Sequence, residues 1–158
     1  MTVQIRPYQP SDKDAVIELW FQCGLVTSAN NPNCDIARKV EFERTCDVAS
    51  DSFLVATSER RVIGTCMAGY DGHRGWINYL AVAPDLQRQG IAGQLMAAAE
   101  ETLAALGCPK INLQIRATNT DVMAFYQTLG YTQDAVISMG KRLSHDPEYQ
   151  SSPSTLSS

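Results

Sequence analysis

The chain has 158 residues, of which 44% are hydrophobic and 19% are charged, and its formal net charge is −4. This size and balance predict one globular domain with a real core. No basic stripe indicates a nucleic-acid-binding protein, and no apolar run approaches the ~20 residues of a membrane span. The first residues lack the apolar core of a signal peptide, so a cytoplasmic protein is expected.

The cysteines are odd in number and widely spaced, with no C-x-x-C pair, and they are Cys23, Cys34, Cys46, Cys66 and Cys108. This spacing predicts reduced thiols rather than a disulfide framework or a zinc site. No metal is therefore expected.

The first expected elements are a strand and a helix. Residues 2–8 alternate between apolar and polar side chains, which predicts a strand that ends at its prolines. A helix should follow, with Ser11 as its N-cap and Gly24 as its stop.

A second helix is expected over residues 35–47, after a polar loop at 26–34. Its buried face should contain Ile36 and Val40, with Phe42 or Cys46. Its charged residues should form a solvated face, and these are Arg38, Lys39, Glu41, Glu43 and Arg44.

Three strands come next. Residues 53–56 and 62–67 predict a hairpin, and residues 76–83 predict a buried central strand after a turn at 70–75. His73 in that turn is interpreted as a solvated residue rather than as a catalytic base.

The carboxy-terminal part alternates helices and strands. Residues 91–106 carry an apolar stripe of helical period, namely Ile91, Leu95, Ala99, Leu103 and Leu106. Residues 111–116 predict a strand, and a last helix should be capped by Asn119 and ended by Gly130. Residues 131–139 should hold the closing strand or strands. The domain is expected to end at residue 143, before a polar, disordered tail over 144–158.

The turn between the central strand and the helix at 91–106 predicts an anion site. Free N–H groups and the helix dipole favour negative charge at a helix N-terminus. The turn has neither the Gly-Lys-Ser/Thr of a Walker loop nor the three glycines of a dinucleotide fingerprint. It does match Q/R-x-x-G-x-G/A, through Gln87-Arg88-Gln89-Gly90-Ile91-Ala92.

That pattern resembles the pyrophosphate loop of the GNAT superfamily of N-acetyltransferases, which bind acetyl-coenzyme A. Two further motifs are similar to those of the family. One is Arg116-Ala117-Thr118-Asn119, at a strand-to-helix junction, and the other is Ala124-Phe125-Tyr126-Gln127-Thr128-Leu129-Gly130-Tyr131. The resemblance covers residues 3–142 and is greatest to the bacterial YpeA-type acetyltransferases. It implies an α+β (mixed α/β), GNAT-like fold, in which about four helices flank a mostly antiparallel twisted sheet of six to seven strands.

The resemblance also implies the site residues. A bulge in the central strand would free the backbone N–H of Leu80 for the thioester oxygen, and Tyr126 would protonate the leaving thiolate. The implied cofactor-binding residues are Leu80, Ala81, Val82, Gln87, Arg88, Gln89, Gly90, Ile91, Ala92, Gly93, Asn119 and Tyr126. From periodicity alone, Tyr126 is a core tyrosine and Asn119 is a helix cap.

The general base is where the sequence departs from the family pattern. Gln114 and Trp76 stand near positions where relatives carry a glutamate, and neither an amide nor an indole can accept the proton of an amine. An ordered water, or Glu18 or Glu41 reaching in from elsewhere, is expected to take that proton.

The sequence therefore predicts an acyltransferase that moves an acetyl group from acetyl-CoA to a primary amine of a small molecule or peptide. Direct transfer in a ternary complex is expected, because no cysteine lies in a recognisable nucleophile site. The alternatives are a non-catalytic acyl-CoA-binding sensor and a nucleotide-binding domain of another kind. No nucleic-acid or membrane partner is expected, and the protein should be a monomer or a homodimer.

Overall fold

The computed structural model describes residues 1–46 and 52–150. Its strands are β1 Gln4–Pro7, β2 Phe53–Ser58, β3 Arg61–Tyr70, β4 Gly75–Val82 and β5 Ile111–Leu113. Its helices are α1 Lys13–Gln22, α2 Pro32–Thr45, α3 Ile91–Ala105 and α4 Thr120–Thr128, with one-turn 3₁₀ helices at Pro10–Asp12 and Pro84–Leu86. Within the described ranges, no helix combines the length and apolarity needed to cross a membrane.

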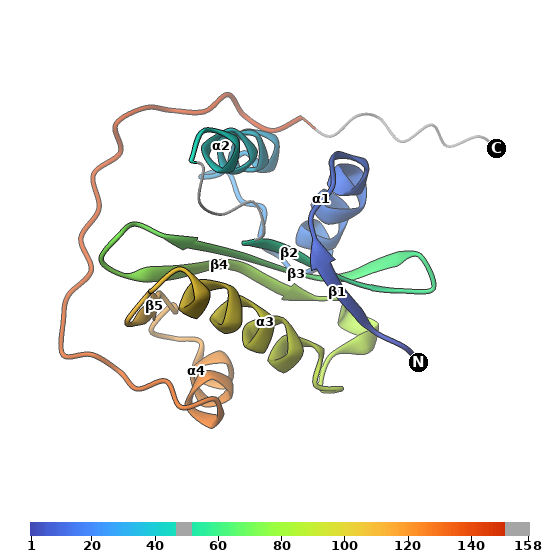
Figure 1. The fold of residues 1–158 in the computed structure, drawn as a ribbon. Helices are drawn as coiled ribbons and strands as arrows, with labels where there is room; N and C mark the ends of the chain where they lie inside the picture. Colours follow the sequence, from blue (N-terminus) through green and yellow to red (C-terminus); the bar gives the residue numbers. More distant parts are fainter. Residues whose placement is uncertain (47–51, 151–158) are drawn as a thin grey trace.

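The strands form one sheet in the order β1-β2-β3-β4-β5. Neighbours from β1 to β4 are antiparallel, whereas β4 and β5 are parallel and are connected through α3. Figure 1 shows α1 and α2 on one face of the sheet and α3 and α4 on the other. The predicted α+β architecture, with its mostly antiparallel sheet and four helices, is therefore confirmed.

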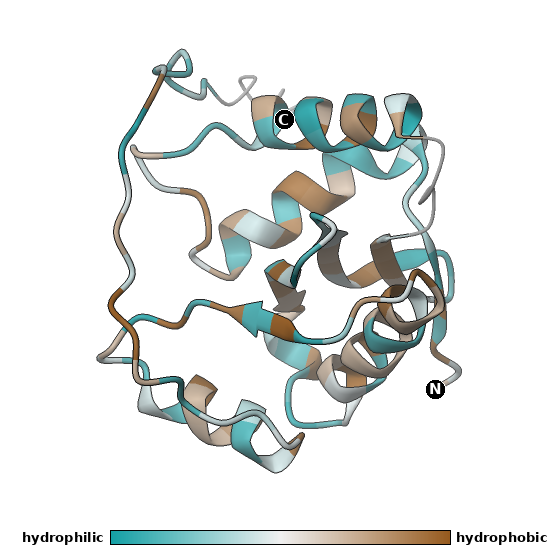
Figure 2. Ribbon diagram, turned by 60° about the vertical axis from the view of Figure 1, so that its left-hand side comes forward, coloured by the Kyte–Doolittle hydropathy of each residue, from teal (hydrophilic) through white to brown (hydrophobic). Residues whose placement is uncertain are grey.

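The prediction of six to seven strands is wrong, because residues 131–139 form no strand in the described chain. Side chains of this segment reach β5 and its flanks, as in the hydrogen bond from Asn112 Nδ2 to Asp134 Oδ2 at 2.9 Å. No backbone ladder accompanies these contacts, and Ile137 and Met139 are 90% and 92% exposed. Figure 2 shows apolar stretches on this outlying segment. The sheet of the described chain ends at β5.

The core lies between the middle strands and the helices on both faces. All of β2 is buried, and so is β3 from Ile63 to Ala68. On α3 the predicted apolar stripe is confirmed, since its first four members are at most 1% exposed and Leu106 is half-buried. Burial of each large side chain of such a stripe contributes roughly 1.5–3 kcal/mol to the free energy of unfolding.

Ser11 does not cap the first helix as predicted. The carboxylate of Asp12 accepts a hydrogen bond from the Gln9 N–H at 2.8 Å and two more from the Arg6 guanidinium, both at 2.8 Å. Because Arg6 lies on β1, this bidentate pair fixes the first strand to the start of α1. Gly24 ends the helix as predicted, with a φ of +69°.

The second helix, α2, begins at Pro32, three residues before the predicted start. Asn31 is its N-cap, because the Asn31 side chain accepts hydrogen bonds from the N–H groups of Asn33 and Cys34. The predicted extension to residue 47 lies outside the described residues.

The predicted faces of α2 are partly wrong. Ile36 is buried, but Val40 and Phe42 are 38% and 54% exposed. Lys39 does not face solvent, because its ammonium donates to Ser52 Oγ at 3.0 Å and to the carbonyl of Ala68. The long lysine side chain thus joins the middle of α2 to the sheet, while apolar side chains of the same helix remain at the surface.

The segment after residue 143 returns to the helices on the α1 and α2 face. The Arg38 guanidinium donates to both carboxylate oxygens of Asp146 at 2.7 Å, and Asn31 Nδ2 donates to the carbonyl of Pro147 at 2.7 Å. Residues 144–150 therefore contact α2, and the rest of the predicted tail, residues 151–158, lies outside the described residues. The domain boundary at residue 143 stays a prediction.

Candidate active site

The central strand β4 contains a bulge at the predicted place. In the ladder with β3, Thr65 faces Ala81 and Met67 faces Asn78, so that Tyr79 and Leu80 together oppose one residue of β3. Tyr79 has a φ of +51°, in the left-handed region that residues with a side chain rarely adopt. The strand therefore changes direction immediately before Leu80.

On its other side, β4 has a half-open edge. Its pairing with β5 covers only the first three residues of β4, from Gly75 to Ile77. Within residues 1–46 and 52–150, nothing forms a ladder with the remaining part of β4, from Asn78 to Val82, on this side. An extended ligand could pair with the exposed backbone groups of this half, as an added strand does.

The open half of β4 leads directly into the predicted anion turn. The Gln87 side chain donates to the carbonyl of Val82 at 3.2 Å, which fixes the turn to the end of the strand. Gly90 is the N-cap of α3 with a φ of +83°, a conformation that suits glycine. A Cβ at Gly90 or Gly93 would meet no other described atom within 4 Å, so the space above this helix terminus is open. The first N–H groups of α3 lack intrahelical partners and can bind an anion there.

The predicted acid, Tyr126, lies on α4 and is buried, with its ring edge-on to those of Phe125 and Tyr131. Burial, followed by the nearby Cys66 thiol, raises the pKa of Tyr126 well above its usual value, so the phenol is protonated at neutral pH. Among the described residues its hydroxyl has no hydrogen-bond partner, whereas every fully buried polar side-chain atom there has one, so this hydroxyl is accessible to solvent.

Asn119 and Gly130 bound α4 as predicted. The Asn119 side chain accepts a hydrogen bond from the Val122 N–H at 3.3 Å, which confirms its role as a helix cap. Gly130 has a φ of +91°, and the N–H of Tyr131 returns to the carbonyl of Tyr126 at 3.1 Å. This Schellman-type end fixes the start of the segment after the helix.

The two residues that replace a glutamate of the family pattern have ordinary polar contacts. The Gln114 amide donates to Ser138 Oγ, and the Trp76 indole N–H donates to Asp71 Oδ2 at 3.3 Å. Neither an amide nor an indole side chain is itself a base.

The expectation that Glu18 or Glu41 reaches the site is wrong. Both carboxylates are exposed and hydrogen-bonded within their own helices, Glu18 to Gln22 at 3.2 Å and Glu41 to Arg44 at 2.6 Å. Among the described residues, neither carboxylate forms a hydrogen bond or an ion pair with β4 or with the turn that follows it. His73 is exposed in its turn, as its interpretation as a solvated residue requires.

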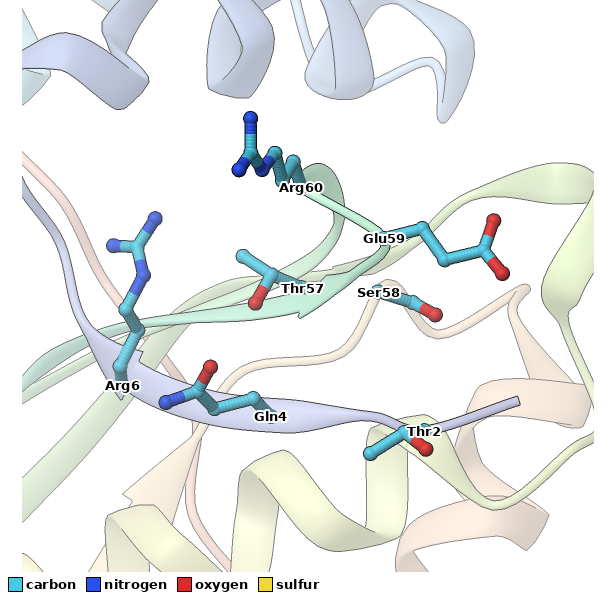
Figure 3. Close-up of a pocket in the computed structure, with 7 residues that line it drawn as sticks. All are labelled: Thr2, Gln4, Arg6, Thr57, Ser58, Glu59 and Arg60. Atoms are coloured by element: carbon cyan, nitrogen blue, oxygen red, sulfur yellow. The ribbon is translucent and has the colours of Figure 1, made fainter.

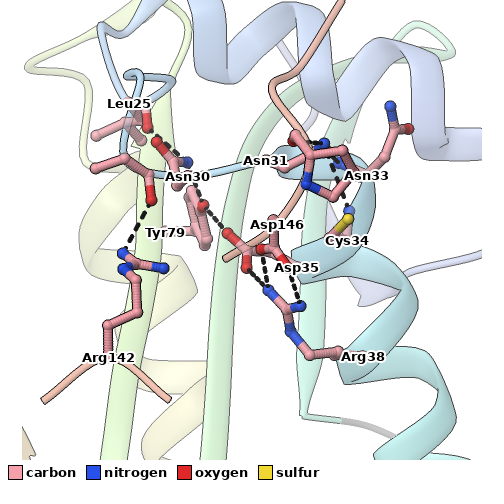
Figure 4. A network of polar contacts seen from close by, with 12 residues as sticks. Leu25, Asn30, Asn31, Asn33, Cys34, Asp35, Arg38, Tyr79, Arg142 and Asp146 are labelled. Carbon is pink, nitrogen blue, oxygen red and sulfur yellow. Dashed lines mark hydrogen bonds and ion pairs between the residues drawn. The ribbon is translucent and has the colours of Figure 1, made fainter. Parts of the chain in front are cut away.

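The structure adds a polar network that sequence reasoning missed (Figure 4). The Tyr79 hydroxyl donates to Asp35 Oδ2 at 2.5 Å and accepts from Asn30 Nδ2 at 2.7 Å. Arg38 donates to the other Asp35 oxygen at 2.7 Å. The only signal in the sequence was an acidic residue in the first turn of α2, which indicates helix capping as readily as a site.

A separate hollow of about 420 Å³ opens at the far edge of the sheet, between β1 and the β2–β3 hairpin (Figure 3). It is lined by Thr2, Gln4, Arg6, Thr57, Ser58, Glu59 and Arg60. None of these is a predicted site residue, and the Arg6 guanidinium is already held by Asp12. The candidate active site is therefore the open half of β4 with the turn that follows it.

The chain is similar in sequence and fold to known proteins. The model of the acetyltransferase (GNAT) family matches residues 14–131. An acetyltransferase of Sodalis glossinidius is 44% identical over 148 residues, which are 93% of this chain and 100% of that relative. Among solved structures, Ard1 from Thermoplasma volcanium has a TM-score of 0.71 at 21% identity, covering 85% of this chain and 86% of that one. The PaiA N-acetyltransferase from Thermoplasma acidophilum, in complex with coenzyme A, has a TM-score of 0.71 at 16% identity, covering 87% and 94%.

Proposed function

Because this chain belongs to the GNAT acetyltransferase family, we propose that it transfers an acetyl group from acetyl-CoA to a primary amine. The acceptor is a small molecule or a peptide, and transfer is direct, within a ternary complex. One observation carries the proposal: the unpaired half of β4 leads through the turn at residues 83–90 to the N-terminus of α3, so an extended ligand on that edge brings its phosphate groups to the helix.

The donor would lie along this edge. Its pantetheine arm pairs with the backbone of Leu80, Ala81 and Val82, and Asn119 contacts the same arm from the start of α4. The pyrophosphate is bound by the N–H groups of the turn and the first turn of the helix, which comprise Gln87, Arg88, Gln89, Gly90, Ile91, Ala92 and Gly93. Acetyl-CoA supplies the acetyl group, and no metal takes part in the transfer.

Transfer needs stabilisation of an oxyanion and protonation of a thiolate. The N–H of Leu80, at the bulge, donates to the thioester oxygen as negative charge develops on it. Tyr126 gives its phenolic proton to the sulfur of the departing coenzyme A, and the proton lost by the attacking amine passes to water.

The cysteines near β4 support direct transfer. Burial raises the pKa of the Cys66 thiol to about 12. The Cys23 thiol donates to the carbonyl of Val82 at 3.3 Å, and burial raises its pKa as well. Both remain neutral thiols at neutral pH, and a thiol is a poor nucleophile compared with a thiolate. The amine therefore attacks the thioester itself.

Two measurements test the proposal. Saturating coenzyme A should raise the melting temperature through preferential binding to the folded state, and calorimetry should detect the same binding. A screen of polyamines, amino acids and peptides with free N-termini should then find an acceptor that releases coenzyme A thiol above the rate with acetyl-CoA alone. Absence of coenzyme A binding, or binding without thiol release on any amine, would overturn the proposed function.

A further inference from the structure

We propose that Tyr79 and Asp35 are positioning residues that hold the β4 bulge in the one conformation that directs the Leu80 N–H toward the thioester oxygen. The inference rests on the proposed function, because Leu80 is the oxyanion donor only in that reaction. It assigns a role in catalysis to α2, where the sequence suggested only Glu41, as a base.

The backbone of Tyr79 needs external support. Its φ of +51° is a left-handed conformation that is unfavourable for a residue with a ring on Cβ. Such a conformation persists when the surrounding structure over-determines it, and it is concentrated at functional sites. The support for Tyr79 comes from three different elements of the fold.

The first support holds the carbonyl of Tyr79. Thr65 Oγ1 donates to this carbonyl at 2.8 Å and accepts from the Trp20 indole N–H at 2.9 Å. The Tyr79 carbonyl and the Leu80 N–H belong to one planar trans peptide and point in opposite directions. Fixing the carbonyl on Thr65 therefore fixes the Leu80 N–H so that it points away from Thr65.

The second support holds the ring of Tyr79. It stacks on the ring of Trp20 with centroids 3.8 Å apart and an angle of 11° between the planes. Trp20 is itself fully buried on α1. Tyr79 therefore packs on the side of α1, whereas Tyr126 belongs to α4, and Figure 1 shows these two helices on opposite faces of the sheet.

The third support holds the hydroxyl of Tyr79, and α2 supplies it. Asp35 accepts the hydroxyl proton, and Asn30 donates to the hydroxyl oxygen. Arg38 occupies the second oxygen of Asp35, so the carboxylate cannot rotate away from the tyrosine (Figure 4). Burial and the bond to Asp35 raise the pKa of Tyr79, so the hydroxyl remains a donor across the physiological range.

Because the hydroxyl lies at the far end of the Tyr79 side chain, its hydrogen bonds restrain the ring and, through the ring, the backbone of Tyr79. If the hydroxyl is released, the ring can slide on Trp20, and the strained φ of Tyr79 can relax toward ordinary extended values. The peptide plane between Tyr79 and Leu80 then rotates, and the Leu80 N–H no longer points toward the thioester oxygen. This rotation should reduce the polarisation of the thioester carbonyl and leave the affinity for the coenzyme A moiety unchanged.

The infrared frequency of the thioester carbonyl measures this polarisation directly. The test uses acetyl-CoA with a ¹³C-labelled carbonyl, bound to the native protein, Tyr79→Phe and Asp35→Asn. Tyr79→Phe keeps the ring and removes the hydroxyl. Tyr8→Phe is the matched control, because the Tyr8 ring also stacks on an aromatic ring, that of Phe53, with centroids 4.5 Å apart.

Native protein should lower the carbonyl frequency relative to acetyl-CoA in water. Tyr79→Phe should lose at least half of this shift and about tenfold in kcat, a fraction of the ~10²-fold that removal of an oxyanion donor costs. Asp35→Asn should lose less in the same direction, since an amide oxygen still accepts from the tyrosine. The KM for acetyl-CoA should stay unchanged in both, and Tyr8→Phe should match the native protein.

Outcomes for this inference and for the proposed function are distinct. A native carbonyl shift and native kcat in Tyr79→Phe would overturn the positioning role and leave the proposed function intact. If Tyr79→Phe does not fold, as judged by circular dichroism, Asp35→Asn decides by the same two readouts. No shift in the native protein, although acetyl-CoA binds, would overturn the role of Leu80 and this inference with it.

Discussion

Thr65→Val replaces one hydroxyl by a methyl group at a position that is completely buried. The hydroxyl joins the fully buried Trp20 indole, at 2.9 Å, to the carbonyl of the half-buried Tyr79, at 2.8 Å. Each buried polar group left unpaired costs about 1–3 kcal/mol, so the valine variant should lose about 2–6 kcal/mol in the free energy of unfolding. Thr65→Ser keeps both hydrogen bonds and loses one buried methyl group, at about 0.8–1.5 kcal/mol.

Urea denaturation followed by tryptophan fluorescence measures these differences, with the buried Trp20 as reporter. The expected order of stability is native, then Thr65→Ser, then Thr65→Val. Thr102→Val is the control, because the Thr102 hydroxyl only donates to the Ala98 carbonyl within α3, at 3.0 Å, and its loss should cost little. If Thr65→Val were as stable as Thr65→Ser, apolar burial would outweigh the two hydrogen bonds and the reasoning would be refuted.

Four further predictions follow from the site and its surroundings. Tyr126→Phe should lower kcat about 10²-fold with little change in coenzyme A affinity, measured by thiol release and calorimetry; unaltered turnover contradicts its role as acid. Gly93→Ala should raise the free energy of unfolding by about 0.5–1 kcal/mol yet weaken coenzyme A binding, because the new Cβ enters the open space above the helix. Glu41→Gln should change kcat less than about twofold, since an exposed side chain held by its own helix does no acid–base work. The Arg6 guanidinium holds the pKa of Asp12 below its usual range. The stabilising effect of the Asp12 carboxylate is therefore complete above about pH 4 and is lost as pH falls. Asp12→Asn should lower the free energy of unfolding by about 2 kcal/mol in urea melts at pH 7, and this difference from the native protein should shrink toward pH 3.

Features set by neighbouring residues could be predicted from the sequence. The Asn119 cap, the glycine ends of α1 and α4, and the buried stripe of α3 depend on contacts a few residues apart, and all are confirmed. Apart from the Ser11 cap, which is a local prediction and is wrong, the failures involve residues that are far apart in the sequence. Nothing near Lys39 indicates that its ammonium bonds to a strand carbonyl 29 residues away.

The candidate site divides in the same way. The glycine-containing turn and the bulge before Leu80 were accessible from the sequence, because a motif marks each position. The Asp35–Tyr79 contact joins residues 44 positions apart, and neither belongs to a motif. The functional roles of Leu80, Tyr126 and the turn remain predictions, as does the YpeA-type subfamily.

The short ladder between β4 and β5 also has a consequence for local unfolding of the protein. Three residue pairs join β5 to the sheet, and Tyr126 is the only buried residue of α4. This strand–helix unit should therefore detach by sub-global unfolding at a lower free energy than β2 or β3, and its amide protons should exchange with solvent first. A donor lying along β4 would bridge the same gap and slow that exchange. The proposed acid would then be held in register only while the donor is bound.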